Sequence, residues 1–297
     1  MLPTPSTSHV PYARVYEPAE DSFLLLDTLS SPSETAFLAT RFPTTTTTPT
    51  TTATTTPSPS PTPLILEIGP GSGVVLAFLT AHANTLFSRR DVLTLGIDVN
   101  RFACAATRET VLRAVRDDAL PLETTLVEGE GGADADGVGR GVATGAGYHL
   151  GTAQGDLVGA VRAGSVDVLV FNPPYVPTPE LPSMYQQGGG AGGEGGGGGQ
   201  ATTTTAAAYE EDSRLLALSY AGGRDGMEIT DRLIEALPEV LSDRGVAYLL
   251  LCAQNKPEEV KSRIRGLPDG AWKAETVGTS GKQAGWEKLQ IVRIWRE

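Results

Sequence analysis

The stretch Leu64-Ile65-Leu66-Glu67-Ile68-Gly69-Pro70-Gly71-Ser72-Gly73 decides the fold of this chain. Its mostly apolar first half predicts a short buried strand, and the glycines that follow predict a tight turn into a helix over residues 74–81. Glycine in such a turn lets the backbone approach a ligand closely. The spacing lacks both the dinucleotide-binding pattern and the lysine of a phosphate loop, so the turn by itself also fits a structural role without a ligand.

Apolar runs and helical patterns alternate on both sides of this stretch. We expect helices over 101–113 and 225–241, and further strands over 92–97, up to Gln154, and over 166–171, 245–252, 272–277 and 289–295. This alternation predicts an α/β fold, with an open, mostly parallel sheet between helices. Ligands of such sheets bind beyond the carboxyl ends of the strands.

Three biased tracts interrupt the pattern: residues 43–63 are rich in Thr and Pro, 128–150 in Gly and acids, and 186–208 in Gly. They have little apolar surface to bury, so we expect flexible, disordered insertions there. The rest of the 297 residues is enough for a single domain over 1–297 with one sizeable core.

Composition argues against several classes of protein. The net charge of −12 makes nucleic acid a less natural partner. Apolar stretches are too short to span a membrane, and the first residues lack the pattern of a targeting signal. Two cysteines, Cys104 and Cys252, favour a reducing compartment over a disulfide scaffold. The histidines His9, His82 and His149 have no metal-ligand spacing, so no metal site is predicted.

Acidic side chains follow the expected strands. Asp98 ends the second strand, where a carboxylate can accept hydrogen bonds from both ribose hydroxyls, although it also fits a helix cap. Asp156 lies at the same expected edge and fits an ordinary turn equally well. Near the amino terminus, residues 17–22 predict a helix start with Pro18 in the first turn, and local sequence favours capping as the role of its acids and of Ser22.

The motif Asn172-Pro173-Pro174-Tyr175 directly follows the strand over 166–171. Two prolines stiffen the loop and remove two N–H donors. The Asn172 side-chain oxygen and the Pro173 carbonyl can then accept the two hydrogens of a flat NH2 group, and Tyr175 can stack on its plane. A proline-rich turn explains the stiffness but not the asparagine and the aromatic residue.

Together these motifs resemble S-adenosylmethionine-dependent amino-group methyltransferases. The segments 15–27, 171–176 and 221–226 make the chain similar to the eukaryotic HemK type, which methylates the glutamine of the Gly-Gly-Gln loop in the class I peptide-chain release factor. The resemblance covers most of residues 12–296 apart from the three tracts. It implies a Rossmann-like, seven-stranded methyltransferase fold with an N-terminal helical segment.

The resemblance also implies roles for individual residues. The S-adenosyl-L-methionine site would be lined by Ser22, Glu67, Gly69, Gly71, Asp98, Asp156, Leu157 and Asn172. Glu67 and the glycines would lie near the methionine portion, Asp98 at the ribose, and Asp156 and Leu157 at the adenine. The catalytic residues would be Asn172, Pro173 and Tyr175. A small zinc-binding activator subunit and a location in the cytoplasm, or also the nucleus, are implied as well.

Two other functions fit parts of the sequence. An adenine N6-methyltransferase acting on DNA or RNA would present the same two amino hydrogens to Asn172, but the acidic charge and the lack of a basic, aromatic-rich segment argue against it. A noncatalytic, cofactor-binding scaffold in a translation complex is the other alternative, and the intact motif over 172–175 argues against that.

Overall fold

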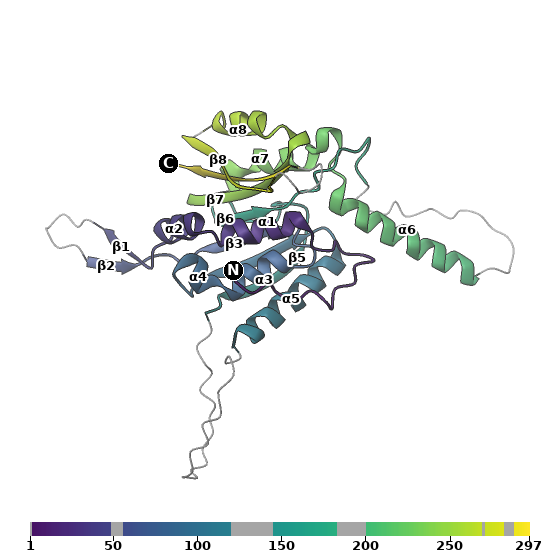
Figure 1. The fold of residues 1–297 in the computed structure, drawn as a ribbon, viewed down its shortest axis with the longest axis horizontal. Helices are drawn as coiled ribbons and strands as arrows, with labels where there is room; N and C mark the ends of the chain where they lie inside the picture. Colours follow the sequence, from purple (N-terminus) through teal and green to yellow (C-terminus); the bar gives the residue numbers. More distant parts are fainter. Residues whose placement is uncertain (1, 49–55, 120–144, 183–199, 269–270, 282–287) are drawn as a thin grey trace, which may run out of the picture.

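The computed structural model describes residues 2–48, 56–119, 145–182, 200–268, 271–281 and 288–297. A seven-stranded sheet forms its centre (Figure 1). The strands, in spatial order, are β5 (Tyr148–Gln154), β4 (Leu93–Asp98), β3 (Leu64–Ile68), β6 (Val166–Phe171), β7 (Leu241–Cys252), β9 (Leu289–Arg296) and β8 (Trp272–Thr279). All neighbouring pairs are parallel except those made by β9, which is antiparallel to β7 and β8.

Helices cover both faces of this sheet. The described helices are α1 (Glu20–Leu29), α2 (Pro32–Arg41), α3 (Val74–Ala81), α4 (Ala83–Phe87), α5 (Arg101–Ala119), α6 (Gln200–Tyr220), α7 (Glu228–Val240) and α8 (Pro257–Arg265), with 3-10 turns at Arg224–Gly226 and Ala253–Asn255. Apolar side chains of α1 to α4 pack with one face of the central strands, and those of α7 and α8 pack with the other. The sheet is therefore buried on both sides, which explains why its strands are nearly continuous apolar runs.

Strand order fixes where a ligand can bind. The chain runs from β3 to β4 and β5 on one side, and then returns to add β6 on the other side of β3. This reversal opens a crevice beyond the carboxyl ends of β3 and β6. The glycine turn over 69–73 and the motif over 172–175 follow these two strands, so both lie at the crevice.

The tracts differ in part from the expected insertions. The Thr/Pro tract contains an antiparallel pair, β1 (Thr45–Thr48) with β2 (Thr56–Pro59). The second tract ends inside β5, which begins at Tyr148, and the third ends inside α6, which begins at Gln200. Residues 49–55, 128–144 and 186–199 lie outside the described residues.

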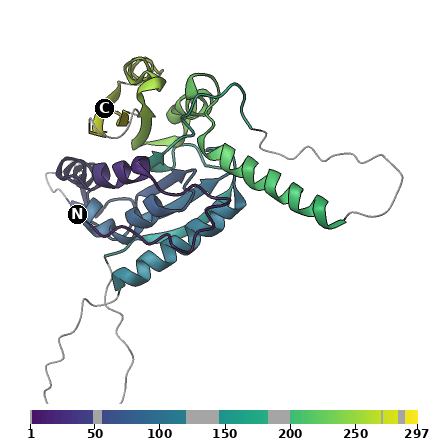
Figure 2. The ribbon, with the colours of Figure 1, turned by 45° about the vertical axis from the view of Figure 1, so that its right-hand side comes forward.

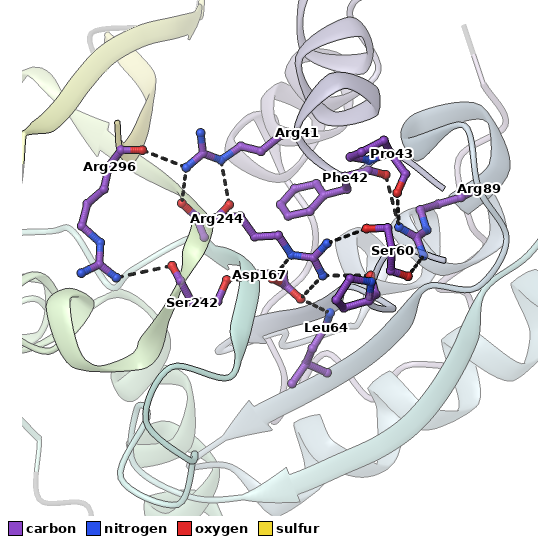
Figure 3. Close-up of polar contacts among 12 residues, drawn as sticks. Arg41, Phe42, Pro43, Ser60, Leu64, Arg89, Asp167, Ser242, Arg244 and Arg296 are labelled. Carbon is purple, nitrogen blue, oxygen red and sulfur yellow. Dashed lines mark hydrogen bonds and ion pairs between the residues drawn. The ribbon is translucent and has the colours of Figure 1, made fainter. Parts of the chain in front are cut away.

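Two arginines, the buried Arg89 and the partly exposed Arg244, hold both ends of the Thr/Pro tract near the amino-terminal ends of the central strands (Figure 3). Arg89 donates from Nη1 to the Pro43 carbonyl at 2.9 Å. Arg244 donates from Nη2 to the Pro61 carbonyl at 2.9 Å, and its Nε pairs with Asp167 Oδ1 at 2.9 Å. The tract therefore leaves and re-enters the fold at fixed points, which local composition did not reveal.

The helix α6 projects from the body in both views (Figures 1 and 2), while its carboxyl-terminal end returns to the crevice. Among the described residues, no helix has the length and apolar character needed to cross a membrane.

Candidate functional site

A cavity of about 500 Å³ lies beyond the carboxyl ends of β3, β4 and β6. Every site residue expected from the sequence lines it: Ser22, Glu67, Gly69, Gly71, Asp98, Asp156, Leu157, Asn172, Pro173 and Tyr175. These residues come from five separate segments of the chain, so the fold brings together what the sequence only suggested. Their individual roles stay predictions.

The glycine turn forms one wall of the cavity. Gly69 has φ +62° and Gly71 has φ +55°, a left-handed conformation that other residues adopt at a cost. A Cβ placed on Gly69 would meet nothing within 4 Å, so the need for glycine there is conformational, and the turn keeps its outer side open to a ligand.

Asp98 lies on the other side of this turn and is 8 % exposed. Its Oδ2 accepts from the Gly71 N–H at 3.1 Å, and its Oδ1 accepts from the Asn100 N–H at 2.8 Å. The residue that caps α5 is Asn100, whose Oδ1 accepts from the Phe102 N–H at 2.9 Å, so the capping interpretation of Asp98 is wrong. Each carboxylate oxygen keeps a second lone pair with which it can accept a hydroxyl hydrogen.

Two carboxyl groups at the floor of the cavity have shifted acidities. Burial raises the pKa of Glu67 to about 8, with a smaller contribution from the nearby charge of Asp98. Burial likewise raises the pKa of Asp98 to about 6, against the effect of its backbone hydrogen bonds. The Glu67 Oε2 atom is buried without a hydrogen-bond partner among the described residues. A cationic ligand group would favour the ionised form of both carboxyls.

Helix α1 contributes the polar contact that sequence reasoning missed. Asp21 is 3 % exposed, and its Oδ2 accepts from Asn172 Nδ2 at 3.1 Å and from the Tyr16 hydroxyl at 3.0 Å. The helix N-cap is Ala19, which makes no side-chain cap bond, and Pro18 precedes it. Asp21 Oδ1 accepts from the Ser22 N–H in the first turn of the helix, so the capping interpretation holds for Asp21, and both Asp21 and Ser22 also line the cavity.

The hydrogen bond to Asp21 sets the orientation of the Asn172 side-chain amide. Since Nδ2 donates to Asp21, the oxygen Oδ1 is left as an acceptor, and it is buried with no partner among the described residues. A buried acceptor without a partner costs roughly 1–3 kcal/mol. A ligand N–H group would remove this cost.

Asp156 lies at the far end of the cavity and forms an ion pair with Arg232 of α7, Oδ2 to Nη2, at 2.5 Å. Both side chains are partly exposed, and both line the cavity. Leu157 follows with φ +49°, which places a strained turn at this edge. The turn role and the ligand role considered for Asp156 are therefore compatible.

A second, apolar part of the lining was missed by sequence reasoning: Leu181, Pro182, Leu215, Leu218 and Ile229. Leu215 and Leu218 are three positions apart on α6, which puts them on one face of the helix. This spacing was a usable signal, but the neighbouring low-complexity tract hid it.

Comparisons with known proteins place this geometry in a family. The chain is 32 % identical to the mouse "Methyltransferase HEMK2" over 300 residues, which covers 99 % of this chain and 96 % of that protein. The chain belongs to the HEMK2 methyltransferase family. The human HEMK2 methyltransferase is 30 % identical, covering 98 % of this chain and 95 % of its own, and the "eRF1 methyltransferase catalytic subunit mtq2" of Schizosaccharomyces pombe is 28 % identical, covering 100 % and 96 %.

No protein-family model matches the chain. Among solved structures, the hMettl16 catalytic domain in complex with an RNA hairpin has a TM-score of 0.43 at 14 % identity, covering 97 % of this chain and 73 % of that chain. The membership of the HEMK2 family therefore rests on the full-length sequence relatives, and the fold rests on the strand order described above.

As a HEMK2-family methyltransferase, the chain is an enzyme whose cavity combines two chemical environments. The wall formed by the turn over 69–73 and by Asp98 and Glu67 offers carboxylates and backbone to a polar, cationic molecule. The corner at Asn172 and Pro173 offers acceptors beside an apolar wall, which fits a neutral group that carries N–H hydrogens.

Proposed function

We propose that this enzyme transfers a methyl group from S-adenosylmethionine to the side-chain amide nitrogen of the glutamine in the Gly-Gly-Gln loop of the eukaryotic peptide-chain release factor. The observation that carries the proposal is the buried, unpartnered Oδ1 of Asn172, a residue that lines the cavity and whose Nδ2 is held by Asp21. The relatives support it, since one of them is named as the catalytic subunit of an eRF1 methyltransferase.

The cavity fits the proposed methyl donor. Its size and its place at the crevice suit a nucleoside with a charged tail, and Glu67 keeps a buried oxygen for a cationic group. In this proposal Asp98 accepts hydrogen bonds from the ribose hydroxyls and Asp156 accepts one from the adenine amino group; both line the cavity. When bound, S-adenosylmethionine supplies an electrophilic methyl group.

The residues of the motif prepare the nitrogen that receives this group. An amide nitrogen is a poor nucleophile because its lone pair is delocalised into the carbonyl. When Asn172 Oδ1 and the Pro173 carbonyl accept hydrogen bonds from the two N–H groups of the substrate amide, they orient the nitrogen lone pair and stabilise the positive charge that develops on nitrogen. Tyr175 lines the same corner and would pack against the amide plane. The rest of the rate comes from alignment and from exclusion of water.

The proposed partner is a small zinc-binding activator subunit that docks on the outer edge of β5. This strand pairs only with β4, so its other edge is unpaired within the described sheet. Tyr148 and Leu150 are 64 % and 57 % exposed there, and Leu112 of α5 is exposed as well. Large apolar side chains on a strand edge favour a protein partner. The changes Leu150→Lys and Tyr148→Lys should abolish co-purification with the activator, while Leu112→Lys alone should weaken it.

A cytoplasmic location, or also a nuclear one, is part of the proposal and is supported by the reducing compartment that two cysteines favour. Fractionation of cells that express a tagged chain would test it; recovery in a secreted or membrane fraction would contradict it.

The substrate is tested by incubating the chain, co-expressed with the activator subunit, with labelled methyl donor and purified release factor. Label should enter the release factor and disappear when its Gly-Gly-Gln glutamine is replaced by alanine. Duplex and single-stranded DNA serve as parallel substrates. Label in DNA, or label in the glutamine-free release factor at an equal rate, would overturn the proposal.

A further inference from the structure

The loop that carries Asn172 to Tyr175 is braced from outside the cavity by another asparagine, Asn255. Asn255 lies in the 3-10 turn after β7, is 2 % exposed and does not line the cavity. Its Oδ1 accepts from the Cys252 N–H at 2.8 Å. Its Nδ2 contacts the carbonyls of Tyr175 at 3.2 Å, Asp225 at 3.1 Å and Gly226 at 3.4 Å. One side chain thus joins the end of β7 to two different loops.

The second of these loops packs tightly on the first. A Cβ on Gly226 would lie 2.0 Å from the Tyr175 carbonyl oxygen, and one on Gly222 would lie 2.3 Å from the Pro174 carbonyl oxygen. Only glycine allows backbone to pass this close to the loop over 172–175. This packing explains the glycines at positions 222 and 226.

Backbone hydrogen bonds tie the same two loops together. The Val176 N–H donates to the Tyr220 carbonyl at 3.0 Å, the Gly222 N–H to the Val176 carbonyl at 2.8 Å, and the Thr178 N–H to the Gly223 carbonyl at 3.0 Å. Pro173 and Pro174 have no N–H group, so they cannot contribute such bonds themselves. Besides β6 and the Asn172–Asp21 hydrogen bond at its amino-terminal end, the position of the motif therefore depends on contacts made at its carboxyl-terminal end.

We infer that Asn255 is a positioning residue of the methyl-transfer reaction, which holds the Asn172–Tyr175 loop in register with the cofactor site through the Tyr175 and Gly226 carbonyls. The inference rests on the proposed function for its catalytic consequence. A displacement of about 1 Å at a reacting group can lower the rate by about a hundredfold. Since Asn255 does not line the cavity, its loss should leave the cofactor wall intact.

The test compares Asn255→Asp with the unmodified chain, both co-expressed with the activator. Aspartate has the same shape and still accepts from the Cys252 N–H, but it cannot donate to the loop carbonyls. We expect kcat for release-factor methylation to fall by about 10- to 100-fold. The dissociation constant of S-adenosylhomocysteine should stay within about twofold of the unmodified value, which a general loss of structure would not allow.

A matched control residue, Asp167, lies near the opposite, amino-terminal ends of the central strands. Like Asn255, Asp167 is buried and makes several hydrogen bonds: it accepts hydrogen bonds from the Leu64 N–H, the Ser242 hydroxyl and Arg244 (Figure 3). Asp167→Asn should lower the melting temperature as Asn255→Asp does, but should leave kcat within about threefold, because it touches neither loop.

Amide hydrogen exchange makes the test independent of activity. The N–H groups of Val176, Thr178 and Gly222 should exchange faster in Asn255→Asp, while those of β3 should not change. In the unmodified chain, the Val176, Gly222 and Cys252 amides should open with similar free energies, which can be measured even if the variant fails to fold.

Each outcome decides one question. Three results would overturn the inference. The first is that Asn255→Asp changes neither the amide exchange nor kcat. The second is that the three amides open with unrelated free energies in the unmodified chain, and the third is that the variant loses cofactor affinity in proportion to kcat. No methylation of release factor by the unmodified pair would instead remove the proposed function, and the exchange data would still decide whether Asn255 holds the loop.

Discussion

The side chain of Asn172 has its direction set by a residue 151 positions earlier in the chain, Asp21. The motif itself could be predicted from sequence, because a strand, an asparagine and two prolines are consecutive. Asp21 could not be predicted as its partner, because the contact depends on where the fold places α1 relative to the residue that follows β6. Local sequence offered only capping, which is the common role of such residues at a helix start.

Asn172→Ala should lower kcat by about 10²- to 10³-fold, since it removes the oxygen that accepts the amide hydrogen. The affinity for S-adenosylhomocysteine should remain measurable, because Asp98 and the glycine turn are unchanged. Kinetics with release factor and calorimetry with the cofactor product would check this. Unchanged turnover would remove Asn172 from the mechanism.

Asp98→Ala should instead act on the cofactor. Its carboxylate supports the glycine turn through Gly71 and is proposed to bind the ribose, so we expect the cofactor dissociation constant to rise by about 10-fold or more, the value of one lost charge-assisted hydrogen bond. Titration calorimetry would measure the constant. A value equal to that of the unmodified chain would count against the ribose assignment.

At the scale of elements, strands were easier to predict than helices. β3, β6 and α3 have the expected bounds, because buried strands and a fully buried helix are continuous apolar runs bounded by polar residues. Helix α8 was not predicted, although Pro257 at its start and buried Val260 and Ile264 give a helical spacing. Its short length and high polarity weakened that signal.

The helix α1 makes a prediction at this scale. Asp21→Asn keeps the shape of the side chain but removes the charge that accepts from Asn172, so we expect kcat to fall by about 10-fold or more. Asp27→Asn, on the same helix but away from the catalytic cavity, is the matched control and should leave kcat unchanged. Equal kcat for both variants would contradict the role of α1 in orienting Asn172.

The two ends of the Thr/Pro tract, which Arg89 and Arg244 hold by hydrogen bonds, give another prediction. Arg244→Ala leaves Asp167 buried without its ion-pair partner and should lower the free energy of unfolding by about 2–4 kcal/mol. Deleting residues 49–55 and closing the β1–β2 hairpin with a two-residue Asn-Gly turn should change it by less than about 1 kcal/mol, because Arg89 and Arg244 hold the backbone on both sides. Denaturant titration would compare the two; a larger cost for the deletion would assign a structural role to the tract.

For the molecule as a whole, the raised pKa values of Glu67 and Asp98 couple stability and ligand binding to pH. The folded, ligand-free protein retains protons that the unfolded chain releases above its ordinary carboxyl pKa. This contribution to stability is complete below about pH 4, and is lost as the pH rises through about 6 for Asp98 and about 8 for Glu67. A cationic ligand favours the ionised carboxyls and therefore binds better at the higher pH.

We expect the dissociation constant of S-adenosylmethionine to fall by up to about tenfold between pH 6.5 and 7.5, with release of protons on binding. Calorimetry in two buffers of different ionisation enthalpy would measure both. Glu67→Gln should flatten the dependence in this range. A constant affinity from pH 6 to 8.5 in the unmodified chain would show that Glu67 does not ionise on binding.

The two ends of the central strands have different roles in this enzyme. The cavity lies beyond the ends where β3, β4 and β6 finish, whereas Arg89 and Arg244, which hold the Thr/Pro tract, lie near the ends where the central strands begin. Evolution can therefore lengthen or rewrite that tract without disturbing the alignment of donor and acceptor, and fusion partners or affinity labels inserted between its anchors should be tolerated for the same reason.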